Sequence, residues 1–174
     1  ISPVFIYKKA KELDGDNEPG TSIRNNMKVL QKHGSCEYSL MPFVKNNDTK
    51  NHVFPAITQK MYDNARKYTI DAYAQVYGID EVKRAIYNEG EVKAGFQVFD
   101  SFMYAEDGFV GPIDGVYHGG HDVPFFGWDD NLERVINGTR YKGFLKFKNS
   151  WGTQWGDNGI GYLAYGLFNH QTPD

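Results

Sequence analysis

The 174-residue chain carries 19 Lys and Arg against 22 Asp and Glu, which gives a net charge of −3, and 40% of its residues are hydrophobic. This composition is typical of a soluble globular protein, and it gives no reason to expect nucleic acid or an anionic membrane as a partner. No apolar run approaches membrane-spanning length, and the single cysteine, Cys36, excludes an intrachain disulfide.

The first part of the chain is predicted to be mainly helix and loop. Residues 1–20 begin extended or as a short helix and end in a turn rich in Asp, Asn and Gly. Thr21 is expected to cap a helix that Gly34 ends, because apolar residues between them recur at helical spacing. After a long loop, Pro55 suits the first turn of a second helix.

The pattern then changes from helical to β. Residues 68–77 are rich in β-branched and aromatic side chains, which predicts a strand, and Asp80 is expected to begin a third helix that runs to Glu89. Beyond residue 90 the hydrophobic pattern has period two, and Asn137-Gly138 is a strong hairpin signal. Strands are predicted near 92–99, 122–128, 142–149 and 160–165, with further turns at 107–108 and 129–131.

A helix-rich part followed by a strand-rich part predicts an α+β fold with two lobes. The first lobe is residues 1–90, the helical part with its crossover, and the second is residues 91–174, an antiparallel and barrel-like β lobe. Two polar residues lie at strand ends of the second lobe: His121 begins one strand and Asn149 ends another, 28 residues later. Neighbouring antiparallel strands would place the His121 ring beside the Asn149 amide.

Such a pair has a chemical meaning. A cysteine nucleophile needs an imidazole to take its proton, and the imidazole needs a third group to fix its tautomer and orientation. An Asn carbonyl can hold the second ring N–H without adding negative charge, and Trp151, two residues later, would shield that bond from water. His and Asn at strand ends are also common as purely structural residues, so the pair alone leaves both readings open.

Two motifs favour the catalytic interpretation of the His121 and Asn149 pair over the structural one. Gly119-Gly120-His121-Asp122-Val123 is followed by Gly127-Trp128, and Lys148-Asn149-Ser150-Trp151-Gly152 is followed by Trp155-Gly156. Together these motifs resemble the papain-like cysteine peptidases, with bacterial-like features, and the resemblance covers nearly the whole chain. It implies a two-lobed fold in which a helical lobe faces an antiparallel barrel-like lobe.

The resemblance also implies roles for the site residues. His121 would act as base and then as acid, Asn149 would orient it, and Trp151 would shield the pair, with no metal or organic cofactor. In this family the nucleophilic Cys and an oxyanion-hole Gln precede a segment that Ile1-Ser2-Pro3 resembles. The chain is therefore expected to be inactive alone. Its expected partners are a protein or peptide substrate and a separate N-terminal chain or segment that carries the Cys.

Several alternatives compete with these assignments. Cys36 follows Gly-Ser as the family nucleophile does, but Pro42 forbids the long helix that should begin there. His118 is a rival imidazole that lacks the motif position, and a metal site is disfavoured because His118, His121 and Asp122 lack a recognised ligand spacing. From another functional class, the protein would be a catalytically inactive relative that serves as a structural or binding module.

The resemblance finally implies a substrate pocket for the residue second before the scissile bond. Its lining from the β lobe would include Gly95, Gly119 and Asp122. Two glycines would make the pocket roomy, and a carboxylate would attract a cationic side chain. Equally, Asp122 would point away and make a structural contact.

Overall fold

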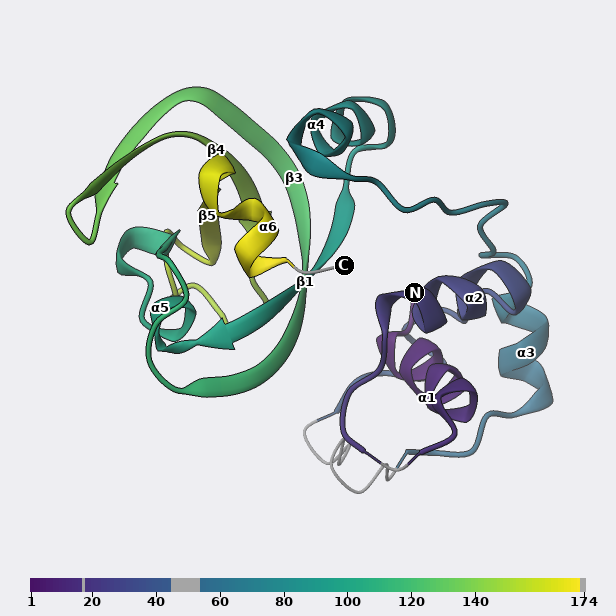
Figure 1. Ribbon diagram of the computed structural model, residues 1–174. Coiled ribbons are helices and arrows are strands. Elements are labelled where there is room, and N and C mark those ends of the chain that lie inside the picture. Colours follow the sequence, from purple (N-terminus) through teal and green to yellow (C-terminus); the bar gives the residue numbers. More distant parts are fainter. Residues whose placement is uncertain (17, 45–53, 173–174) are drawn as a thin grey trace. The chain divides into compact units, whose positions relative to one another are not determined.

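The computed structural model describes residues 1–16, 18–44 and 54–172, which form two compact units, Ile1–Ala74 and Gln75–Asp174 (Figure 1). Each unit is described by itself. In the part of the chain that is described, no helix is both long and apolar enough to cross a membrane.

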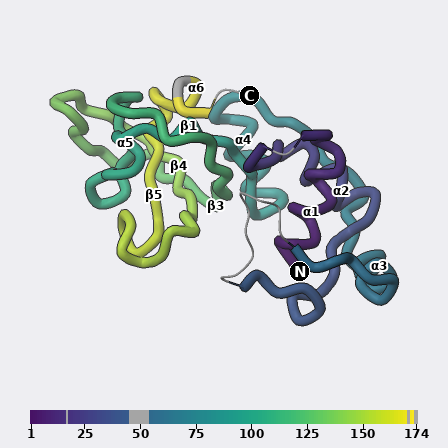
Figure 2. Tube along the Cα trace, turned by 90° about the horizontal axis from the view of Figure 1, so that it is seen from below, coloured from purple at the N-terminus to yellow at the C-terminus, as the bar shows by residue number. Residues whose placement is uncertain are grey.

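The first unit is helical, and its first helix is longer than expected. Helix α1 spans Pro3–Asp14; the Ser2 hydroxyl accepts a hydrogen bond from Phe5 N, and Gly15 closes the helix in a left-handed conformation at φ 73°. Pro3 fits because the first helical position needs no N–H donor. Helix α1 and helix α2, which spans Ile23–Lys32, lie side by side in both views (Figures 1 and 2).

Two predicted helix starts in this unit are wrong by a few residues. Helix α2 is capped by Ser22, whose hydroxyl accepts from Asn25 N at 3.1 Å, because the hydroxyl of Thr21 donates to Asp14 instead. Helix α3 spans Gln59–Ala65 and begins after Thr58, not at Pro55. In both places a hydroxyl that reaches the first-turn N–H groups sets the boundary.

The core of the first unit includes the cysteine. Val4, Phe5, Cys36, Met41 and Ala65 form one buried cluster. The chain enters this cluster through Gly34, which sits at φ +73° against the backbone of the last turn of α3, where a Cβ atom would overlap the carbonyl of Ala65. No other residue type fits that position without strain.

The predicted strand at 68–77 is absent. The segment is irregular, and among the described residues no strand pairs with it. Tyr73 and Tyr77 are 41% and 66% exposed. High β-propensity does not make a strand where no partner supplies the backbone hydrogen bonds.

The second unit is built on one five-stranded sheet of order β1-β3-β4-β5-β2. All neighbouring pairs are antiparallel except β2 with β5. The sheet curls strongly (Figure 1) but is not closed, since β1 and β2 are edges, so the predicted barrel-like lobe is an open curled sheet. The strands are β1 Val92–Phe99, β2 Phe109–Val110, β3 Tyr117–Ile136, β4 Thr139–Lys148 and β5 Ile160–Ala164.

Helix α4, Gly78–Glu89, belongs with this sheet. Its buried residues Val82 and Ile86 join the core of the second unit, which is why the units divide after Ala74, whereas the expected boundary lay near residue 90. The predicted end of this helix at Glu89 is confirmed; its start lies two residues before Asp80. The remaining helical elements are short: α5 Asp100–Met103, η1 Glu106–Gly108, η2 Tyr165–Leu167 and α6 Phe168–Gln171.

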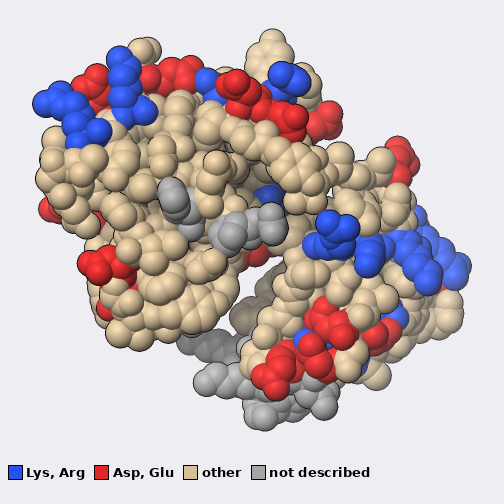
Figure 3. Space-filling view, in the orientation of Figure 1, with Lys and Arg blue, Asp and Glu red and all other residues tan. Residues whose placement is uncertain are grey.

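The hairpin signal is confirmed, and one predicted turn is not. Asn137 and Gly138 join β3 to β4 with φ values of 48° and 78°, as a two-residue turn requires. The predicted turn at 129–131 is instead an irregularity within β3, where the register shifts between Asp129 and Glu133. At the hairpin end, Lys and Arg lie beside Asp and Glu (Figure 3), so no single-sign field forms there.

Candidate active site

His121 and Asn149 meet as predicted. His121 lies on β3 opposite Phe96 of β1, and Asn149 directly follows the last residue of β4. The His121 Nε2 and Asn149 Oδ1 atoms are 2.9 Å apart. Asn149 is only 6% exposed, and its backbone N–H donates to the Gly159 carbonyl at 2.8 Å. The backbone hydrogen bond to Gly159 therefore fixes the position of Asn149, and the Asn149 amide in turn fixes the orientation of the imidazole.

This contact sets the tautomer of the ring. An amide oxygen can only accept, so Nε2 carries the proton in the neutral ring and the Nδ1 lone pair is left to accept another. Among the described residues, none hydrogen-bonds Nδ1 of His121. The arrangement can therefore take a proton at Nδ1 while Asn149 stabilises the ring's orientation.

Two aromatic rings pack against the imidazole of His121. The Trp151 ring stacks on the imidazole with centroids 4.8 Å apart and 27° between the planes. Phe102 meets the imidazole edge-on at 6.0 Å and also contacts Trp151 at 5.3 Å. Sequence reasoning found Trp151 but missed Phe102, because nothing in α5 itself indicates that it packs beneath a residue of β3.

The Trp/Gly-rich turn after Asn149 is shaped by its glycines. Gly156 has φ +58°, and a Cβ atom there would lie 2.6 Å from the Ile160 carbonyl oxygen. The turn closes with Gly159 N donating to the Trp155 carbonyl at 2.8 Å. The Trp155 indole N–H, in turn, donates to the backbone carbonyls of α5. The turn thus anchors both Asn149 and α5.

His118, the alternative imidazole, pairs with a carboxylate outside the His121–Asn149 pair. His118 Nε2 lies 2.7 Å from Asp100 Oδ1, and Asp100 was not singled out from the sequence. Within the described ranges, no three His, Cys, Asp or Glu side chains gather in a way that could hold a metal ion.

Cys36 does not look like a nucleophile in its own surroundings. Its side chain is fully buried in the first unit. Burial raises the pKa of its thiol above the ordinary value, so at neutral pH it stays protonated. A reactive thiol needs both access and a lowered pKa.

Two of the three expected pocket residues are neighbours across strands. Gly95 pairs directly with Asp122, whereas Gly119 pairs with Val98 three positions along. Asp122 is exposed by surface area, yet protein atoms crowd its carboxylate; this desolvation raises its pKa, while Lys93 and His121 act in the opposite direction. Directly opposed residues of an antiparallel pair share one face of a sheet, so Asp122 and Gly95 lie on the same face.

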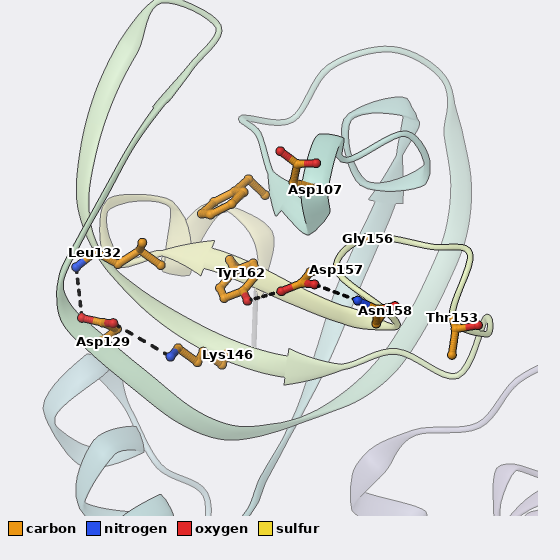
Figure 4. A pocket seen from close by; sticks show the side chains of 10 residues that line it. Asp107, Asp129, Leu132, Lys146, Thr153, Gly156, Asp157, Asn158 and Tyr162 are labelled. Carbon is orange, nitrogen blue, oxygen red and sulfur yellow. Dashed lines mark hydrogen bonds and ion pairs between the residues drawn. The ribbon is translucent and has the colours of Figure 1, made fainter.

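A separate pocket of about 430 Å³ lies on the second unit, and none of the predicted site residues lines it (Figure 4). Its lining includes Phe109 and Tyr162, whose ring centroids are 4.6 Å apart in a stacked arrangement. Its carboxylates are already satisfied: Asp157 accepts from the Tyr162 hydroxyl at 2.7 Å, and Asp129 lies 3.9 Å from the Lys146 ammonium. We therefore place the candidate chemistry at His121 and not in this separate pocket.

Comparisons with known proteins point to the same family as the two sequence motifs. Residues 14–171 match the family model described as papain family cysteine protease. A peptidase C1-like protein of Acanthamoeba polyphaga mimivirus is 28% identical, over 94% of this chain and 53% of the relative. A cathepsin B-like protein of Giardia intestinalis is 27% identical, over 85% of this chain and 47% of the relative. The chain thus spans about half the length of these curated relatives.

Solved structures show the same fold. Xylellain, a cysteine protease from Xylella fastidiosa, aligns with a TM-score of 0.79 at 24% identity, covering 99% of this chain and 67% of that chain. The procathepsin B S9 of Trypanosoma congolense aligns with a TM-score of 0.67 at 23% identity, covering 94% of this chain and 54% of that one.

Proposed function

The chain belongs to the papain family of cysteine proteases, and from this premise we propose that it supplies the base and the orienting amide of a Cys-His-Asn site that hydrolyses peptide bonds. The attacking thiol is supplied by polypeptide outside residues 1–174. The observation that carries this proposal is the 2.9 Å contact between His121 Nε2 and Asn149 Oδ1 beneath Trp151.

The contact leads directly to a mechanism. The thiol proton moves to Nδ1 of His121, and the sulfur bonds to the carbonyl carbon of the scissile peptide. The imidazolium then gives that proton to the leaving amine nitrogen as the C–N bond breaks, which leaves an acyl-thioester. Water then gives a proton to His121 as its oxygen bonds to the thioester carbonyl carbon. The C–S bond breaks, the acid leaves, and His121 returns the proton to the sulfur, which restores the thiol. Asn149 stays neutral throughout and holds the ring in one orientation.

The burial of Cys36 supports an external thiol. A thiol with no exposed surface cannot approach a substrate carbonyl, and a raised pKa leaves little thiolate at neutral pH. A structural role in the first unit's core accounts for Cys36 fully, since buried cysteine packs as a small hydrophobic residue.

The test is an epoxide probe of the kind that labels papain-family thiols, applied to the product of the complete gene. We expect one cysteine other than Cys36 to be labelled, peptide substrate to be hydrolysed, and both to be lost in His121→Ala. A complete product that neither reacts nor hydrolyses peptides would instead favour the inactive structural or binding module.

A further inference from the structure

We propose that Asp100 and His118 form a clasp that positions His121, so that both are positioning residues of the site. The inference rests on the proposed function for its meaning, because a clasp on His121 matters to catalysis only if His121 is the base. Its evidence is independent, since it comes from contacts on α5 and on the loop that leads into β3.

Asp100 uses both carboxylate oxygens on that loop. Oδ1 lies 2.7 Å from His118 Nε2, and Oδ2 accepts from Val116 N at 2.9 Å. These two bonds hold the pKa of Asp100 below its ordinary value, so the group is a carboxylate at neutral pH. Gly115, at φ +87°, lies so close to Asp100 that a Cβ atom would overlap its carboxylate. The loop is therefore shaped around this one side chain.

A backbone contact adds to the clasp. Ser101 N donates to the Asp114 carbonyl at 3.2 Å. Two consecutive residues at the start of α5 thus hold the segment 114–118, which leads into β3 and includes its first two residues, at three points. His118 is three residues before His121 on the same strand, β3, so the clasp fixes the path of the chain into the candidate base.

The other end of α5 touches the site itself. Phe102 packs edge-on against the His121 ring and against Trp151, and its ring stacks on Trp155 at 5.3 Å. Because α5 has only four residues, a shift at Asp100 is transmitted directly to Phe102. Through α5 the clasp holds His121 from two directions: along β3 and through the ring that supports it.

This role differs from that of an ordinary surface ion pair. Asp100 and His118 have side chains that are 37% and 35% exposed, and such pairs contribute little to global stability. Their removal should leave the fold intact and loosen His121 locally. A local effect of this kind is seen in the exchange of a single ring proton rather than in the melting temperature.

The test uses the whole chain of residues 1–174, labelled with nitrogen-15 at histidine. NMR at neutral pH reports the tautomer of His121 and the rate at which its Nε2 proton exchanges with water, with His121→Gln to assign the signal. The variants are Asp100→Ala, His118→Ala and His118→Gln, whose amide can still donate to Asp100. The matched control is Asp114→Asn, which removes a carboxylate of the same segment whose side chain makes no hydrogen bond or ion pair with a described residue.

We expect the Nε2–H tautomer in the wild type, and an exchange rate about tenfold higher in Asp100→Ala and His118→Ala, as the loss of a hydrogen bond to a charged group implies. His118→Gln should return towards the wild-type rate, and Asp114→Asn should match it. Wild-type exchange in both alanine variants, with circular dichroism unchanged, would overturn the clasp. If Asp100→Ala does not fold, the comparison of His118→Ala with His118→Gln decides alone.

The readout needs no catalysis, so it separates the two proposals. Failure of the clasp would leave probe labelling of the complete protein unaffected. Failure of the proposed function would leave the tautomer and the exchange rates of His121 as they are.

Discussion

Among single residues, Asn149 is the one on whose side-chain amide the proposed orientation of the base depends. It is buried, it accepts from Nε2 of His121, and it is tied to Gly159 through its backbone. In the proposed mechanism Asn149 keeps Nδ1 of His121 pointing at the reactants, which is a matter of orientation and not of charge.

Replacing Asn149 by Ala in the complete protein should therefore lower kcat by about 10²-fold with a smaller change in KM, because a misoriented base loses most of its general-base contribution. Steady-state kinetics on a peptide substrate measures this. Asn88→Ala, on the exposed surface of α4, is the control and should leave both constants unchanged. A wild-type kcat in Asn149→Ala would remove Asn149 from the mechanism.

Asp122 is the residue for which the proposed function predicts an effect on substrate choice. If it lines the proposed pocket with Gly95, the complete enzyme should prefer Lys or Arg over Leu at the residue second before the scissile bond, by about ten- to hundred-fold. Lys93, which lowers the pKa of Asp122 by its charge, competes with such a substrate cation. A substrate library screened on wild type and on Asp122→Ala measures the preference; the same strong preference for Leu in both proteins would show that Asp122 points elsewhere.

The preference for a cationic substrate residue should weaken as the pH falls. Desolvation raises the pKa of Asp122, so its carboxylate takes up a proton at a higher pH than an ordinary Asp. The preference for a cation should be complete above that pKa and should fade as the pH falls through it, before ordinary carboxylates titrate.

At the scale of elements, close packing between β4 and β5 limits the sequence. Gly161 faces the ring of Phe147, and a Cβ atom at Gly161 would overlap that ring. Gly161→Ala should therefore lower the free energy of unfolding by about 1–3 kcal/mol, as overpacking does in a dense core. Gly127→Ala on β3 is the matched control, because a Cβ atom there meets no atom within 4 Å and its φ is ordinary. Urea unfolding compares the two; equal midpoints would mean that the ring of Phe147 moves aside at no cost.

The elements also show which features a sequence can predict. Strand β1 is predicted at its observed bounds, because its alternating pattern and flanking Gly90 are local signals. The Asn137-Gly138 hairpin is equally local. The strand predicted at 68–77 is wrong because a strand needs a partner, and two-residue β2 is missed because its existence depends on pairing with β5. The predicted start of α2 is wrong because a neighbouring carboxylate, Asp14, takes the expected capping hydroxyl.

In the molecule as a whole, some parts of the candidate site are predictable from the sequence and others are not. The contact between His121 and Asn149 is predictable, because two motifs place both residues on neighbouring strands. The expectation that His121 begins its strand is wrong: β3 starts at Tyr117, four residues earlier, where its pairing with β1 begins, and only Asn149 lies at a strand end. The parts played by Phe102 and Asp100 are not predictable, because both residues belong to α5. The sequence of α5 contains no signal for the residues that α5 contacts in the fold. Packing partners from distant segments are what the sequence alone does not supply.

We propose that residues 1–174 hold the base and its orienting amide and that the thiol comes from other polypeptide. The most direct test treats the isolated chain with an epoxide probe of papain-family thiols, followed by mass spectrometry, with a peptide substrate assayed in parallel. We expect no adduct and no hydrolysis, because Cys36 is buried and its thiol pKa is raised. Stoichiometric labelling of Cys36 together with turnover of the peptide would contradict it.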